Sequence, residues 1–241
     1  MDNQGFLAAI EKSFVEFIKS GTSRSTKKLV PLHGAIAKDI LARLGGTASG
    51  YSVMSQGYAT GKEGTISGRY MEKKVDITIF RNAHAVGGIA VKFVMQNYSQ
   101  NSNNYFENML GETANIRSAR CPYFQVFIIP DKLPYYNRDK EIQHWESFTD
   151  NNIHKYCVLD RDNPEVSFHS PNKMLIYVVK LPDVGDVRTL DSYRREYQAL
   201  FARRGEGGFL DVSAVARFSN AVILNDYETF ADKVHHAIMA L

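Results

Sequence analysis

The chain has 241 residues, of which 44% are apolar and 23% charged, and this composition excludes a disordered or fibrous protein. A chain of this length buries roughly 70–75% of its unfolded surface, so its core requires no disulfide or structural metal. Lysine and arginine number 29 against 26 acidic residues, and a net charge of +3 does not by itself indicate a nucleic-acid-binding protein. Cys121 and Cys157 lie far apart without metal-ligand spacing, which argues against a zinc module and favours a reducing compartment.

No apolar run approaches the roughly 18 residues of a membrane span, and the first residues lack a signal-peptide pattern. We therefore expect a cytoplasmic protein with no membrane partner. The segment 61–65 (GKEGT) lacks the spacing of a phosphate-binding loop, so we expect no nucleotide cofactor. Because no internal repeat or long linker is visible, the chain is predicted to form one domain over residues 1–241.

The first half of the chain passes from helical patterns to strand patterns. Apolar residues spaced three and four apart predict helices at 6–19 and 29–44, the first with Asn3 available as its cap. Segments rich in aromatic or β-branched residues then predict strands at 51–56, 66–71 and 74–80. The nearly continuous apolar run 86–95 is typical of a strand covered on both faces, and its one charged residue is Lys92.

The second half begins with a helical pattern at 103–117 that lies between the strand 86–95 and a second apolar strand, 123–129. A connection of this length indicates a crossover between strands of one sheet, so the sheet is expected to be mixed. Further elements are predicted as a helix at 141–156, a strand at 174–179, a helix at 190–204, a strand at 221–224 and a helix at 226–240. The fold class is therefore α/β, with a mixed central sheet flanked by helices.

Asp76 and Lys92 are charged residues with apolar neighbours in the predicted strands 74–80 and 86–95. A hairpin of the segments 74–80 and 86–95 would set Asp76 beside Lys92, where a carboxylate would compensate the cost of burying an ammonium group. One interpretation is functional: Asp76 holds a divalent metal, and Lys92 orients or polarises a water near a phosphate. The other interpretation is a structural ion pair, and spacing alone favours it.

This arrangement resembles the PD-(D/E)xK nucleases, and particularly the type II restriction endonucleases. The matching residues are Val75-Asp76 and Ala90-Val91-Lys92, within a core of about residues 29–130 to which helix 3–20 and additions at 140–241 are attached. The resemblance implies a restriction-endonuclease-like fold, Mg²⁺ as cofactor, double-stranded DNA as substrate and a homodimer that cleaves site-specifically. The sequence departs from the family pattern at Ala90, where an acid is expected.

A carboxylate from the following helix is the expected substitute, since some members of this family supply it there. Glu107 and Glu112 fall on opposite flanks of that helix's apolar face, so only one of them is expected to reach the sheet. We favour Glu107, which lies nearer to Lys92, and keep Glu112 and, third, Glu72 as alternatives. The predicted catalytic residues are Asp76, Lys92 and Glu107, and the predicted metal ligands are Asp76, Glu107 and Glu112.

The amide-rich segment 96–104 follows the lysine strand directly and is the most unusual in composition. Asparagine and glutamine can contact bases and phosphates, and tyrosine can stack or donate a hydrogen bond, although a polar loop would have a similar composition. Basic residues at 24–28, among them Lys28, add a cationic stretch. The predicted DNA-binding residues are Lys73, Lys74, Gln96, Asn97, Tyr98, Gln100, Asn101, Asn103 and Asn104.

These residues together predict hydrolysis of DNA phosphodiester bonds by a magnesium-dependent endonuclease. Two other classes remain open. A non-catalytic DNA-binding or scaffold protein would retain the fold without the acid at Ala90. A structural α/β protein would contain Asp76 and Lys92 as a plain salt bridge and would not bind DNA.

Overall fold

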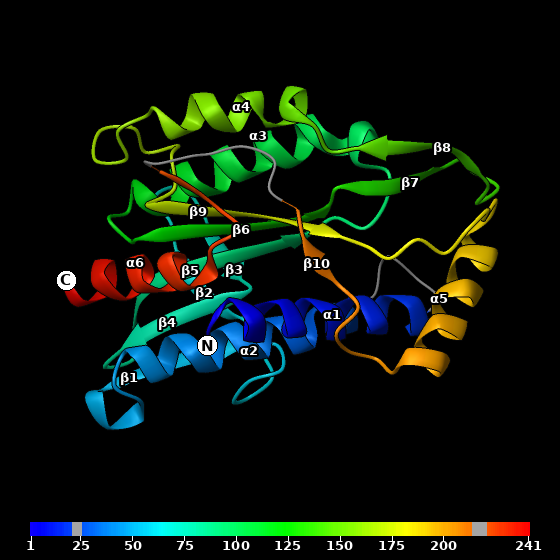
Figure 1. Cartoon of the computed structure of the whole chain (residues 1–241). Helices are drawn as coiled ribbons and strands as arrows, with labels where there is room; N and C mark the ends of the chain where they lie inside the picture. The colour runs from blue at the N-terminus through cyan, green and yellow to red at the C-terminus, as the bar shows by residue number, and fades with distance from the viewer. Residues whose placement is uncertain (21–25, 214–220) are drawn as a thin grey trace.

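A computed structural model describes residues 1–20, 26–213 and 221–241, and Arg24 of the predicted cationic stretch lies outside them (Figure 1). Its helices and strands confirm the α/β class with a mixed central sheet flanked by helices. In the described part of the chain, the α-helices are α1 (Asn3–Ser20), α2 (Val30–Arg43), α3 (Tyr98–Arg117), α4 (Asp150–Asp160), α5 (Leu190–Arg204) and α6 (Tyr227–Met239). Short 3₁₀ turns η1 (Thr26–Leu29) and η2 (Thr47–Ser49) lie at either end of α2.

The central sheet has the strand order β1-β4-β5-β6-β9 and ends on two short strands that both pair with β9. Its strands are β1 (Tyr51–Ser55), β4 (Ile77–Arg81), β5 (His84–Phe93), β6 (Tyr123–Pro130), β9 (Lys173–Lys180), β10 (Asp211–Val212) and β11 (Val222–Leu224). Strands β1, β4 and β5 pair antiparallel, whereas β5, β6 and β9 are parallel. The predicted hairpin and strand-helix-strand unit are thus both confirmed, and the C-terminal third of the chain completes the sheet.

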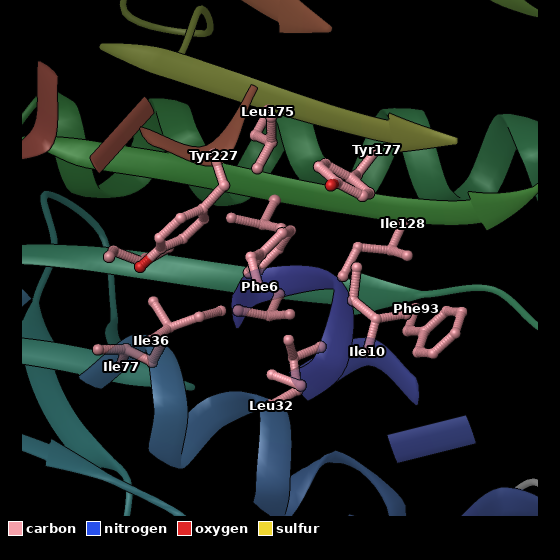
Figure 2. Packing of buried hydrophobic residues seen from close by; sticks show 14 of the residues in the cluster. Phe6, Ile10, Leu32, Ile36, Ile77, Phe93, Ile128, Leu175, Tyr177 and Tyr227 are labelled. Carbon is pink, nitrogen blue, oxygen red and sulfur yellow. The ribbon is translucent and has the colours of Figure 1, made fainter. Parts of the chain in front are cut away.

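Helices cover both faces of this sheet because its parallel strands are apolar on both sides. Alternate residues of β6 pack on opposite layers: Val126 and Ile128 join α1, α2, α5 and α6, while Phe127 and Ile129 join α3 and α4. Figure 1 shows α3 and α4 together along one side of the sheet and α1 and α2 along the other. Figure 2 shows the first of these layers, where Phe6 stacks on Tyr227 at a centroid distance of 4.2 Å.

Two small hairpins lie outside the central sheet. Strands β2 (Gly64–Ser67) and β3 (Glu72–Val75) form one, and β7 (Lys132–Tyr136) and β8 (Ile142–Ser147) form the other. The first hairpin packs on β5 and α3 through Ile66 and Val75. Gly88 of β5 allows this approach, because a Cβ there would lie 2.7 Å from the Ile66 side chain.

Several boundaries differ from the sequence prediction. The predicted strand 74–80 is two strands, because the chain bends at Asp76 between β3 and β4. The predicted helix 141–156 is wrong in its first half, which forms β8, and β7 was not predicted because Pro134 interrupts its strand pattern. Asn3 does not cap α1: its Oδ1 accepts the backbone N–H of Tyr227 at 2.6 Å, at the start of α6.

Candidate active site

Asp76 lies at the bend between β3 and β4, where the β4–β5 hairpin turns its carboxylate towards β5. Its Oδ2 accepts a hydrogen bond of 2.7 Å from the backbone N–H of Val91. The pKa of Asp76 is raised to about 6, mainly by burial and to a smaller extent by the nearby Glu112 carboxylate, while the Val91 hydrogen bond and two lysines act in the opposite direction. The ionised form of Asp76 is therefore unfavourable in the folded protein, and a bound cation would stabilise it.

Lys92 lies on β5 between two residues of the core, Val91 and Phe93. Because successive side chains of a strand alternate, Lys92 points away from that core, towards the side of the sheet covered by α3. Its ammonium lies 4.2 Å from the centroid of the Tyr105 ring, which α3 supplies. Partial desolvation lowers the pKa of Lys92, while Asp76 and Glu112 act in the opposite direction.

Glu112 completes the group from α3. Its carboxylate forms an ion pair with the ammonium of Lys73 and accepts a hydrogen bond of 3.4 Å from the Tyr123 hydroxyl. Asp76, Lys92 and Glu112 line one recess between β5, β6 and α3. Only one of the two helix acids reaches the sheet, as expected, and it is Glu112.

Glu107 and Glu72 lie outside this recess. Glu107 is exposed on α3, and the 100° rotation per residue of a helix explains why it cannot share the face of Glu112. Glu72 is exposed at the far end of β3, and the bend at Asp76 removes it from the same strand face as Asp76. The geometry therefore does not bring our preferred acid, Glu107, or the third candidate, Glu72, to Asp76 and Lys92.

Gln125 is a recess residue that was not predicted from the sequence. It lies on β6 directly beside Ala90, the position where the resemblance leads one to expect an acid, and it is buried. Its amide nitrogen donates a hydrogen bond of 3.4 Å to Thr113 on α3. The sequence does contain a signal for Gln125, because it is a single polar residue in the apolar strand YFQVFII, as Lys92 is a single charged residue in its own strand.

In the ranges 1–20, 26–213 and 221–241, no cluster of three or more His, Cys, Asp or Glu side chains is arranged to hold a metal ion. Asp76 and Glu112 nevertheless place two carboxylates in one recess, with the Gln125 amide also lining it. Mg²⁺ prefers oxygen ligands and often binds through only one or two carboxylates together with water and substrate phosphates. The donor set therefore fits Mg²⁺, with the Lys73 ammonium as a competing cation at Glu112.

The amide-rich segment 96–104 is mostly helical, because α3 begins at Tyr98 rather than at the predicted residue 103. Tyr98 is buried against Phe127 and Phe148, so its prediction as a DNA contact is wrong. Asn97 has a structural role: its side chain bonds both the N–H and the C=O of Tyr136, at 3.0 and 2.8 Å. Among the remaining candidates, Gln100, Asn103 and Asn104 are exposed, and Gln96 and Asn101 are half-buried.

A second recess continues from the first one past Lys92 and Tyr105, which line both. Lys28 reaches it from η1, Gln96 from the segment before α3, and Gln100 and Asn101 from the first turn of α3. No acidic residue lines this second recess in the part of the chain that the structure describes. Burial lowers the pKa of Lys28 to about 8, and the positive charge of Lys92 adds to the effect. Two ammonium groups are thus held near one another beside the carboxylates.

Lys73 and Lys74 lie on β3, next to the first recess. Lys73 is half-buried and holds Glu112, whereas Lys74 is exposed. The structure thus places Lys73 in contact with a recess residue and leaves Lys74 at the surface.

Comparison with protein-family models, with curated proteins and with solved structures finds no match to this chain. None of the helices in the described ranges is long and apolar enough to cross a membrane.

Proposed function

We propose that the chain is a Mg²⁺-dependent nuclease that hydrolyses phosphodiester bonds of double-stranded DNA. The observation that carries this proposal is that Asp76 from the β3–β4 bend, Lys92 from β5 and Glu112 from α3 line one recess. Two carboxylates beside a lysine offer both a cation site and a positive charge for an anionic substrate. The resemblance of Asp76, Ala90 and Lys92 to the PD-(D/E)xK pattern supports the same reaction.

Asp76 and Glu112 would hold Mg²⁺, which supplies stabilisation of the negative charge that develops on phosphate oxygens. Lys92 would hold the attacking water or a phosphate oxygen by donating a hydrogen bond from its ammonium. Its lowered pKa suits a group that exchanges protons with water. Hydrolysis then forms one bond from the water oxygen to phosphorus and breaks one phosphorus–oxygen ester bond.

The second recess supports a nucleic-acid substrate rather than a small phosphate ester. Lys28 and Lys92 extend the positive charge away from the carboxylates, and exposed side-chain amides of α3 add neutral hydrogen-bonding groups beside it. A strand of DNA carries phosphates at regular spacing, and neutralising several of them favours binding. By resemblance to the type II restriction endonucleases, we further propose sequence-specific cleavage by a homodimer.

The test is incubation of purified protein with long duplex DNA and Mg²⁺. We expect cleavage that EDTA abolishes and that Lys92→Ala reduces by roughly a hundredfold or more, as for loss of an acid–base or charge-stabilising group. Lys38→Ala is the matched control, because Lys38 is an exposed lysine of α2 outside both recesses.

Intact DNA across several divalent metals, with folded wild-type protein, would contradict the proposed function. A non-catalytic DNA-binding protein is the second candidate, favoured by the Lys73–Glu112 ion pair that already neutralises one carboxylate. Binding of the same DNA without cleavage would assign the chain to that class. Absence of both binding and cleavage would assign it to the structural class, without the expected salt bridge, since Asp76 pairs with the Val91 N–H and Lys92 lies over Tyr105.

A further inference from the structure

The four-residue loop of the β2–β3 hairpin, Gly68 to Met71, exposes two large apolar side chains next to each other. Tyr70 is 77% exposed and Met71 is 65% exposed. Exposed apolar residues are ordinary when they are scattered singly, but an adjacent aromatic and aliphatic pair at a hairpin tip is a candidate contact surface. We call residues 68–71 the hairpin tip.

The hairpin tip is held rigidly by Asn115 of α3. The Asn115 Oδ1 accepts the backbone N–H groups of Tyr70 and Met71 at 2.9 and 3.3 Å, and its Nδ2 donates to the Met71 carbonyl at 2.9 Å. Gly68 packs so closely that a Cβ there would lie 2.2 Å from the Asn115 amide nitrogen. Because every one of these bonds uses backbone atoms of the tip, the Tyr70 and Met71 side chains remain exposed on a fixed support.

The residues that hold the hairpin tip are connected to the candidate active site through α3 and β3. Asn115 follows Glu112 by one turn of α3, and β3 leads from the tip to Lys73, which binds Glu112. The exposed pair is therefore held by the same helix, α3, that supplies Glu112 to the recess.

The charge around the tip favours an anionic partner with apolar surfaces. Arg69 and Lys74 are exposed beside the pair, against one exposed acid, Glu72. DNA presents phosphates and stacked bases together, and apolar wedges that enter the duplex next to basic residues are a known means of opening a base step. A second copy of this chain would offer a less complementary surface at its net charge of +3.

We propose that Tyr70 and Met71 form a wedge that contacts and unstacks bases of the DNA held at the Asp76–Glu112 recess. This inference rests on the proposed function for its substrate. In this proposal the hairpin tip contacts the bases, whereas Lys28 and Lys92 contact the DNA backbone.

The experiment measures binding of duplex DNA that contains 2-aminopurine to the wild-type protein, with EDTA in place of Mg²⁺ to prevent cleavage, and to the same protein with the changes Tyr70→Ala and Met71→Ala. We expect the wild-type protein to raise 2-aminopurine fluorescence by unstacking, and the tip variant to abolish this rise. The tip variant should also bind about five- to a hundredfold more weakly, the range for loss of a base-stacking contact. Val166→Ala, which truncates a side chain that is 73% exposed elsewhere, is the matched control.

The outcomes separate the two proposals. Tip-dependent binding by a wild-type protein that does not cleave DNA would support the wedge and overturn only the nuclease activity. Cleavage by wild type with unchanged binding and fluorescence in the tip variant would overturn only the wedge. Conversion from dimer to monomer by the tip variant, with unchanged DNA affinity, would assign the tip to a second copy and also overturn the wedge. Failure of the wild-type protein both to bind and to cleave DNA would overturn both.

Discussion

Asp76 is the residue at which the requirements of folding and of the proposed chemistry conflict most. It is removed from water next to a second carboxylate, and this combination raises its pKa to about 6. Below pH 3.8, its ordinary pKa, the side chain is protonated in both folded and unfolded chains, and its contribution to stability is fully present. As pH rises through about 6 that contribution is lost, because the folded protein must ionise a group in an unfavourable place.

Replacement of Asp76 by asparagine is therefore predicted to stabilise the metal-free protein at pH 8 by about 2 kcal/mol, after allowance for its partial exposure. The asparagine oxygen can still accept the Val91 hydrogen bond. The difference in free energy of unfolding between variant and wild type should be small at pH 4 and reach its plateau above pH 6. Urea denaturation in EDTA measures it, and an equal difference at both pH values would contradict this reading of Asp76.

Addition of Mg²⁺ at pH 8 provides the complementary result. A cation bound at Asp76 and Glu112 stabilises the folded chain by mass action, so wild type should gain stability and Asp76→Asn should gain little. An equal gain in stability in both proteins would show that Mg²⁺ binds at another site.

At the scale of elements, α3 organises the site. It supplies Tyr105 under the Lys92 ammonium, Glu112 to the recess and Asn115 to the hairpin tip. Its first turn is fixed by a carboxylate from β8: Glu146 accepts the backbone N–H groups of Tyr98 and Ser99 at 2.6 and 3.0 Å. Acids favour helix N-termini because the unpaired N–H groups carry partial positive charge.

Glu146→Ala is predicted to cost about 2 kcal/mol of folding free energy, since it leaves buried N–H groups of α3 without their charged acceptor. Hydrogen exchange should accelerate first at the amides of residues 98–102, and thermal unfolding should occur at a lower temperature. Glu165→Ala, at an exposed glutamate, is the control. Unchanged exchange at the start of α3 would show that other contacts define that helix end.

The start of α3 shows which features of the fold a local sequence pattern cannot predict. Its extension from residue 103 back to 98 depends on Glu146, some 48 positions away, and on burial of Tyr98, neither of which a local pattern contains. The break at Asp76 is likewise set by packing of β2 and β3 against β5 rather than by a local turn signal. By contrast, α5 was predicted at its observed bounds, because the glycine that ends it, Gly205, can be recognised from the local sequence alone.

At the scale of the whole molecule, hydrophobic periodicity was enough to predict two of the strand pairings in the central sheet. An antiparallel hairpin that brings Asp76 to β5 and a parallel pair joined by α3 could both be derived from apolar runs and their spacing. The spacing could not show which acid joins Asp76. Glu107 and Glu112 lie on different faces of α3, and tertiary packing decides which face of the helix turns towards the sheet. Gln125 and Lys28 meet the site through the arrangement of the sheet and η1, which no spacing rule encodes.

The most direct measurement compares Mg²⁺-dependent DNA cleavage by Glu112→Gln and Glu107→Gln. Both changes remove one carboxylate charge from α3, but only Glu112 lies with Asp76 and Lys92. We predict a loss of roughly a hundredfold or more for Glu112→Gln, typical of removing a group that stabilises transition-state charge, and cleavage near the wild-type rate for Glu107→Gln. Equal rates for the two variants, or loss confined to Glu107→Gln, would contradict a site built from Asp76, Glu112 and Lys92.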